Sequence, residues 1–201
     1  QGGVISPVLA NIYLHYVLDL WFEKKVKPLM KGRAMLIRYA DDFVVAFQYR
    51  HEAEVFYRVL PKRLNKFGLS VAPEKTHLKR FSRFHPGRKR RFQFLGFEYY
   101  WSLDKNMQPR LRRHTSSEKL KTAMSEFYRW IKFNRSKPLR ETMPVLKRKL
   151  MGFQNYFGLP DNSRSLSRLS NYVLHSLYKW LNRRSQRRSY NWSSFKDMLG
   201  Y

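Results

Sequence analysis

The sequence predicts an α+β domain followed by a small bundle of three helices. Hydrophobic residues make up 43% of the 201 residues and aromatic residues 16%, which is enough to bury a hydrophobic core. In the first half, segments typical of strands lie between segments of helical periodicity, and in the second half three helical segments follow one another. We expect the first domain to span residues 1–113 and the second to span residues 114–201.

Two helices are predicted in the first domain. Ser6 as an N-cap and Pro7 at the first helical position favour a helix that runs to about Phe22. A second helix fits residues 52–67, where apolar side chains recur at helical spacing. Gly68 follows it and can adopt the left-handed conformation that ends a helix.

Between these helices, the segment LIRYADDFVVAF at residues 36–47 predicts a β-hairpin with a tight turn at residues 40–43. Asp41 and Asp42 then lie at its tip, where two carboxylates repel each other unless a cation or hydrogen bonds hold them. A hard divalent ion such as Mg²⁺ binds carboxylate oxygens and resolves this conflict. The alternative is that the two acids form only a polar turn, in which Asp is common.

A basic loop at residues 79–91 leads into a predicted strand from Phe92 to about Trp101. Its aromatic and arginine side chains can stack on bases and bind phosphates, although a core strand is the simpler interpretation of most of it. Three helices are predicted after it, over residues 114–133, 144–157 and 165–184, the second ended by Gly158. Thr115 and Glu118 have the spacing of a capping box at the start of the first.

The chain is strongly basic, with 41 Lys and Arg against 14 Asp and Glu and a net charge of +27. Residues 1–76 hold 12 basic and 7 acidic residues, whereas residues 77–201 hold 29 and 7. This imbalance predicts nucleic acid as the partner, with an incidental basic surface or an anionic membrane as the alternatives. With no long apolar run, no signal peptide and no cysteine, we expect a soluble cytoplasmic protein without a membrane partner.

Four blocks in order resemble the palm of a reverse transcriptase of the group II intron type. They are QGGVISPVLANIYL at residues 1–14, YADDF at 39–43, GLSVAPEKT at 68–76 and FLGF at 94–97. YFGLPDNSR at residues 156–164 and LNRRSQRRSYNWSSF at 181–195 are similar to the thumb or maturase region of these proteins. The resemblance implies a partial palm followed by a helical thumb.

The resemblance also implies catalytic roles. Asp41 would bind two Mg²⁺ ions together with an acid from an earlier palm block, and Asp42 would be a neighbouring ligand. Lys75, of the EKT block, would neutralise or protonate the departing pyrophosphate, and its alternative is a solvated surface lysine. Other acids, including Asp19 and Glu74, are interpreted as surface residues.

Further residues are assigned to nucleic-acid binding by the same resemblance. The template- and nucleotide-binding candidates are Gln1, Gly2, Gly3, Tyr39 and Ala40, and the primer-grip candidates are Phe94, Leu95, Gly96 and Phe97. The RNA-binding candidates are Arg88, Arg90, Arg91, Arg183, Arg184, Arg187 and Arg188. Two alternatives stay open: the glycines form a flexible turn, and some of the last four arginines cap a helix.

The predicted function is RNA-directed DNA synthesis that uses an RNA template, a DNA primer and deoxynucleotides, combined with binding of the intron RNA as a splicing maturase. We find neither a strand with the partner aspartate nor a basic fingers segment, and so expect a fragment of a longer polypeptide that is inactive alone. The alternatives are a non-catalytic maturase that keeps the palm as a scaffold, and a related bacterial reverse transcriptase used in defence.

Overall fold

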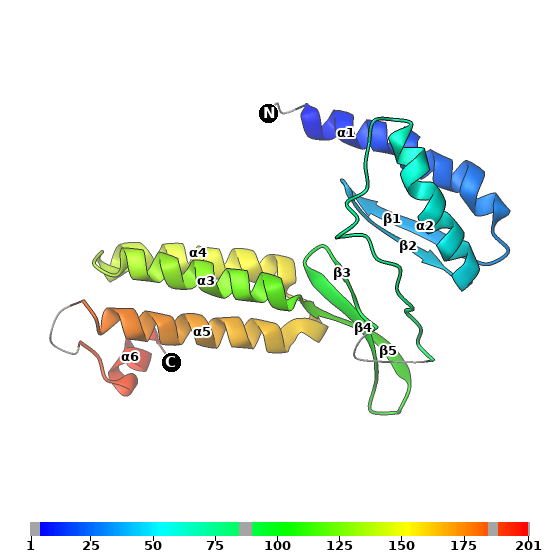
Figure 1. Ribbon diagram of the computed structural model, residues 1–201. Coiled ribbons are helices and arrows are strands. Elements are labelled where there is room, and N and C mark those ends of the chain that lie inside the picture. The colour runs from blue at the N-terminus through cyan, green and yellow to red at the C-terminus, as the bar shows by residue number, and fades with distance from the viewer. Residues whose placement is uncertain (1–4, 85–89, 185–188, 201) are drawn as a thin grey trace. The chain divides into compact units, whose positions relative to one another are not determined.

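The computed structural model describes residues 5–84, 90–184 and 189–200. It contains helices and two small antiparallel sheets, which confirms the predicted α+β class (Figure 1). The chain divides into two compact units. We call Gln1–Leu95 with Tyr100–Arg110 the first unit, and Gly96–Tyr99 with Leu111–Tyr201 the second unit.

The first unit begins with a helix that changes its hydrogen-bond pattern along its length. It consists of α1 (Ser6–Leu14), two π-helical turns η1 (His15–Asp19) and η2 (Phe22–Val26), and a 3₁₀ turn η3 (Lys27–Leu29). Ile5 occupies the N-cap position without a side-chain cap, so the predicted Ser6 cap is wrong. The helical segment also extends past Phe22, because the π turns keep burying apolar residues such as Val17 and Val26.

The predicted hairpin is confirmed as β1 (Ala34–Tyr39) and β2 (Asp42–Phe47), paired antiparallel from Ala34 opposite Phe47 to Tyr39 opposite Asp42. Its turn has two residues, Ala40 and Asp41, and is therefore shorter than expected. Alternate residues lie on opposite faces of the hairpin. The inner face packs on the core through Leu36, Phe43, Val45 and Phe47, and the outer face exposes Met35, Ile37 and Tyr39.

Helix α2 (Arg50–Asn65) completes the core of the first unit and confirms the second predicted helix. Phe56, Leu60 and Leu64 are buried along one face, as the helical spacing predicts. Gly68 follows with φ +67°, which is the left-handed conformation expected at a helix end.

A three-stranded sheet follows, in the order β3 (Phe92–Phe94), β4 (Phe97–Leu103) and β5 (Pro109–Thr115). The single strand predicted from Phe92 to Trp101 is wrong, since it is interrupted at Leu95 and Gly96. Both residues have positive φ, +51° and +77°, as the two central residues of a type I′ hairpin turn require. Leu95 hides this turn from sequence analysis, because a residue with a Cβ rarely adopts positive φ.

The second unit packs four helices around one core: α3 (Ser117–Asn134), α4 (Leu139–Phe157), α5 (Ser163–Leu181) and α6 (Trp192–Leu199) (Figure 1). The first three confirm the predicted bundle, although α4 begins before Pro144. Helix α6 was not predicted; it inserts the fully buried Phe195 into the core. None of the helices formed by the described residues is both long and apolar enough to cross a membrane.

The helix α3 is capped by Ser116, whose side chain accepts the N–H of Lys119, so the predicted Thr115 capping box is wrong. Thr115 instead binds the fully buried Asn162, which lies between α4 and α5. Asn162 Oδ1 accepts the N–H of Thr115 at 2.8 Å, and its Nδ2 donates to Thr115 Oγ1 and to the carbonyl of Phe157, both at 2.8 Å. One amide thus joins the end of β5 to the end of α4.

Replacing Asn162 with Ala should destabilise the second unit by about 1–3 kcal/mol for each buried group left without a partner. The N–H of Thr115 would be the main loss, because it is buried and its acceptor would be gone. Urea unfolding followed by circular dichroism measures the change. Asn155→Ala, at an exposed site on α4, is the matched control and should leave the unfolding midpoint unchanged; equal midpoints for the two variants would contradict the structural role of Asn162.

Candidate active site and nucleic-acid interface

The two adjacent carboxylates lie at the tip of the β1–β2 hairpin and are exposed. Asp41 is the second residue of the turn, and Asp42 begins β2 opposite Tyr39. Within the described residues, neither side chain takes part in a hydrogen bond or an ion pair. Their oxygens are therefore available to a hard cation, which prefers carboxylate ligands.

The described residues bring no group of three or more His, Asp or Glu side chains together as a metal site. Asp41 and Asp42 fit a Mg²⁺ site by the chemistry of their oxygens, but they supply only two carboxylates. A complete site for Mg²⁺, which prefers six oxygen ligands, needs further ligands from water, substrate phosphates or other acids.

The turn that carries Asp41 is anchored by Arg38, at the end of β1. Arg38 Nη1 donates to the carbonyl of Ala40 at 2.8 Å and to Asn11 Oδ1 at 2.9 Å. Its Nε and Nη2 donate to the two carboxylate oxygens of Asp19, at 2.8 and 2.7 Å. The guanidinium therefore joins the N-terminal helix to the hairpin turn.

The contact with Arg38 shows that Asp19 is not the simple surface residue expected from the sequence. Its side chain is 25% exposed and that of Arg38 is 11% exposed. The hydrogen bond from Arg38 lowers the pKa of Asp19, and the same bond raises the pKa of Arg38. No local sequence signal links the two residues, because they lie on different elements and face each other only after folding.

Acid should weaken the first unit through Asp19. A carboxyl group with a lowered folded pKa stabilises the fold above its unfolded pKa, about 3.9, and loses this contribution as the pH falls through the folded pKa. Asp19→Asn should therefore lower the urea midpoint at about pH 6, and the difference from wild type should shrink below about pH 3. Glu23→Gln, in an exposed pair with Lys27, is the control with little effect at either pH. A wild-type advantage over Asp19→Asn that stayed constant down to low pH would contradict this role.

The residues around the acids form an exposed apolar face. Tyr39 is 66% exposed beside Asp42, and Ile37 and Met35 continue the same face along β1. Ala40 has φ +53°, uncommon for a residue with a Cβ, and its small side chain leaves space beside the acids. The candidates Gln1, Gly2 and Gly3 lie outside the described residues.

Lys75 lies in a turn after α2, where its backbone N–H donates to the carbonyl of Ala72. Its side chain is exposed and, in the part of the chain that the structure describes, makes no hydrogen bond or ion pair with Asp41 or Asp42. Tyr57 of α2 supports this loop by donating its hydroxyl to the carbonyl of Thr76 at 3.3 Å. The structure thus holds the loop to α2 but does not join Lys75 to the acids.

The four primer-grip candidates lie in and beside the β3–β4 turn. Phe97 is buried against the rings of Tyr156 and Phe157 from α4, with centroid distances of 6.0 and 5.0 Å. Gly96 accepts the N–H of Ser116, and a Cβ at Gly96 would lie 3.3 Å from Phe157 in a strained left-handed backbone. Gly96 and Phe97 therefore have a packing role, while Phe94 and Leu95 are half-buried.

The candidate RNA-binding arginines fall in both units. In the first, Arg90 is half-buried and Arg91 lies over the ring of Tyr100 at 5.0 Å. In the second, Arg184 donates to the carbonyl of Lys137 at 3.2 Å, so it holds the loop after α3. Arg88, Arg187 and Arg188 lie outside the described residues.

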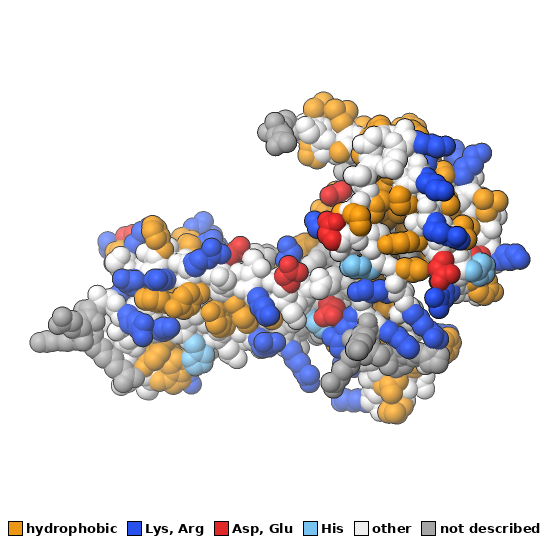
Figure 2. Space-filling view, viewed as in Figure 1, with side chains coloured by type: hydrophobic (Ala, Val, Ile, Leu, Met, Phe, Trp, Pro, Cys, Tyr) orange, Lys and Arg blue, Asp and Glu red, His pale blue; other side chains and the backbone are white. Residues whose placement is uncertain are grey.

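Four exposed cations surround the largely buried ring of Trp180 on α5. The charged groups of Lys132, Arg135, Lys179 and Arg183 lie 5.2–5.8 Å from its ring centroid. We call these five residues the Trp180 cluster. Lys132 lies on α3 and Arg135 directly follows that helix. Sequence analysis did not single them out, because their contact with Trp180 depends on the packing of the bundle. Figure 2 shows Lys and Arg side chains spread over the visible face of the helical bundle with few acids among them.

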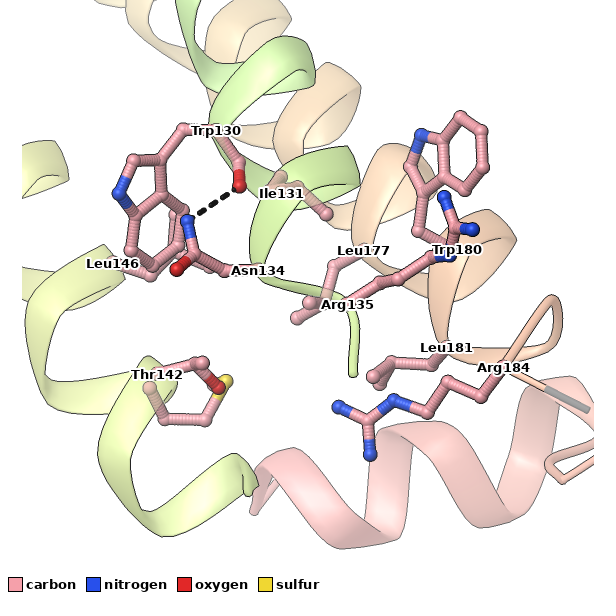
Figure 3. Close-up of a pocket in the computed structure, with 11 residues that line it drawn as sticks. Trp130, Ile131, Asn134, Arg135, Thr142, Leu146, Leu177, Trp180, Leu181 and Arg184 are labelled. Atoms are coloured by element: carbon pink, nitrogen blue, oxygen red, sulfur yellow. Dashed lines mark hydrogen bonds between the residues drawn. The ribbon is translucent and has the colours of Figure 1, made fainter. Parts of the chain in front are cut away.

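A small hollow lies beside this cluster, between α3, α4 and α5. Figure 3 shows Trp130, Asn134 and Thr142 on one side and Leu181 and Arg184 on the other. Asn134 Nδ2 donates to the carbonyl of Trp130 at 2.9 Å. The interior of the hollow has room for no more than about one water molecule. The hollow is therefore too small for a nucleotide.

Two family models match the chain in succession. The model described as reverse transcriptase (RNA-dependent DNA polymerase) matches residues 1–99, which include the hairpin and its acids. The model described as group II intron, maturase-specific domain matches residues 120–197, which include the Trp180 cluster. The chain therefore belongs to the group II intron reverse transcriptase/maturase family, as its motifs predict. The comparison with curated proteins gives no match.

Proposed function

We propose that this chain supplies the second part of the palm and the thumb of an RNA-directed DNA polymerase that also binds its intron RNA as a maturase. Residues 1–113 would be the palm and residues 114–201 the thumb. The observation that carries the proposal is the exposed pair Asp41 and Asp42, unpaired among the described residues and held in a turn anchored by Arg38. An RNA template, a DNA primer and deoxynucleotides would be bound in the cytoplasm.

In this mechanism Asp41, with Asp42 beside it, would hold two Mg²⁺ ions together with an acid from an earlier palm block. The ions would supply activation of the primer hydroxyl and stabilisation of the charge on the transferred phosphoryl group. Tyr39 and Ala40 would border the primer end and the nascent base pair from the exposed face of the hairpin. Lys75 would act on the departing pyrophosphate once substrate is bound.

A second candidate function is RNA binding without catalysis. It is favoured by one observation: the described residues bring no third acid to Asp41 and Asp42. On the polymerase hypothesis that acid belongs to a longer polypeptide, and these 201 residues alone would bind nucleic acid without synthesising DNA. On the maturase-only hypothesis no such polypeptide would extend a primer.

Asp41→Asn should abolish primer extension on an RNA template by a polypeptide that carries this chain and the earlier palm block. The rate should fall by several powers of ten, because a neutral amide binds Mg²⁺ weakly and electrostatic stabilisation of the transferred phosphoryl group is the main catalytic contribution. Affinity for the template–primer should be unchanged in a filter-binding assay. Glu23→Gln removes an exposed acid from the same unit and should extend normally; near wild-type extension by Asp41→Asn would refute the assignment.

Binding of RNA should depend on the Trp180 cluster together with the arginines after α5. Replacing Lys132, Arg135 and Arg183 with Gln should weaken binding and flatten the slope of log affinity against log salt by about 0.7–0.9 for each phosphate that the variant no longer binds. The fold should persist, since exposed cations contribute little to stability.

The control removes the same charge from exposed positions of the first unit, with Lys24, Lys25 and Arg58 changed to Gln. Because this variant has the same net charge, a smaller effect on the salt slope would assign the phosphate-binding surface to the cluster. Equal effects of the two variants would show that only overall charge matters.

A further inference from the structure

We propose that Arg38 is a positioning residue for the metal-binding carboxylates, and that Asp19 and Asn11 hold it in place. The inference rests on the proposed polymerase function, because it assigns Arg38 a role in that same site. Arg38 does not reach the acids itself. It acts through the carbonyl of Ala40, the residue directly before Asp41.

The geometry of the guanidinium supports this role. Arg38 makes four hydrogen bonds of 2.7–2.9 Å, two to the carboxylate of Asp19, one to Asn11 and one to the turn. A planar guanidinium can form this bidentate pair and reach a further acceptor, whereas a lysine ammonium cannot reproduce the fork. The turn residue Ala40 has φ +53°, a conformation that needs support from its surroundings.

A π turn in the N-terminal helix sets the position of Asp19 relative to Arg38. Asp19 ends the π turn η1, in which the N–H of Leu20 donates to the carbonyl of His15, five residues earlier. A π turn changes the face on which the following side chains lie, and such turns are frequent at functional sites. The same turn is also held by α2, because Arg63 Nε donates to the carbonyl of Val17 at 3.1 Å.

A stabilising role alone explains this arrangement poorly. Compared with apolar side chains of similar volume, a largely buried ion pair usually adds little net stability, because desolvation of the two charges opposes their attraction, although loss of one partner, as in Asp19→Asn, is destabilising. The first unit already has a continuous apolar core that includes Phe22, Phe56 and Leu60. The ion pair with Asp19 holds Arg38 where it fixes the carbonyl of Ala40, next to Asp41 and Asp42. Groups that orient metal ligands in this way affect metal affinity and activity.

The test compares Arg38→Lys with wild type in the polypeptide used for primer extension. We expect a loss of about 10–100-fold in kcat and a higher Mg²⁺ concentration for half-maximal rate, as for other residues that orient metal ligands. The KM for template–primer should be unchanged. Asp19→Asn should act in the same direction, and the double variant should lose less than the product of the single losses, because the two residues act as one unit.

Two controls separate positioning from loss of stability. Arg50→Lys alters an exposed ion pair with Glu54 on α2 and should leave all kinetic values unchanged. Leu64→Val removes a methylene group from the buried core, so it lowers the melting temperature without touching the turn. If Leu64→Val raised the Mg²⁺ requirement as much as Arg38→Lys does, or if Arg38→Lys kept the wild-type Mg²⁺ dependence and kcat, the inference would be overturned.

The outcome stays interpretable if the proposed function fails. Amide hydrogen exchange of this 201-residue chain reports the turn without catalysis, and Arg38→Lys should speed exchange at the Tyr39–Asp42 pair that closes the turn while Arg50→Lys does not. A wild-type polypeptide that does not extend primers would refute the function, and faster exchange would still support the anchoring. Unchanged exchange in Arg38→Lys would refute the positioning role, whether or not the wild type extends primers.

Discussion

The candidate site depends on one guanidinium that connects two separate pieces of backbone. The hairpin packs its inner face on the core through apolar contacts, which fix the sheet but do not specify the conformation of its tip. Directional hydrogen bonds from Arg38 supply that specification, because they reach both Asp19 on the helix and the carbonyl of Ala40. The acids can therefore remain exposed to a ligand while Arg38 fixes the backbone of the turn that carries them.

In the second unit, a neutral side chain, that of Asn162, connects separate segments of backbone. Asn162 is fully buried, and its amide oxygen accepts the N–H of Thr115, which would otherwise be buried without a partner, while its Nδ2 also donates to the carbonyl of Phe157. Its position in the motif YFGLPDNSR thus has a physical explanation in packing. On the surface of the unit, several cations lie around the ring of Trp180.

Features set by neighbouring residues could be predicted from the sequence. Helix α2 with Gly68, the β1–β2 hairpin and the amphipathic helices of the bundle follow from periodicity and local turn preferences. The predictions failed where packing overrides local preference. Leu95 adopts positive φ in a tight turn. Thr115 forms hydrogen bonds with Asn162, 47 residues away, instead of capping α3. The link between Arg38 and Asp19 had no local signal, since it arises only when the helix packs against the hairpin.

The π turns in the first helix have a consequence for how its sequence can change. An α-helix advances one turn every 3.6 residues, and a π turn accommodates more residues without ending the helix. A single-residue insertion or deletion near η1 or η2 can therefore be absorbed within the helix by creating or removing such a turn. In a helix that lacked the η1 turn, the residue twelve positions after Pro7 would therefore lie on a different side of the helix from Asp19.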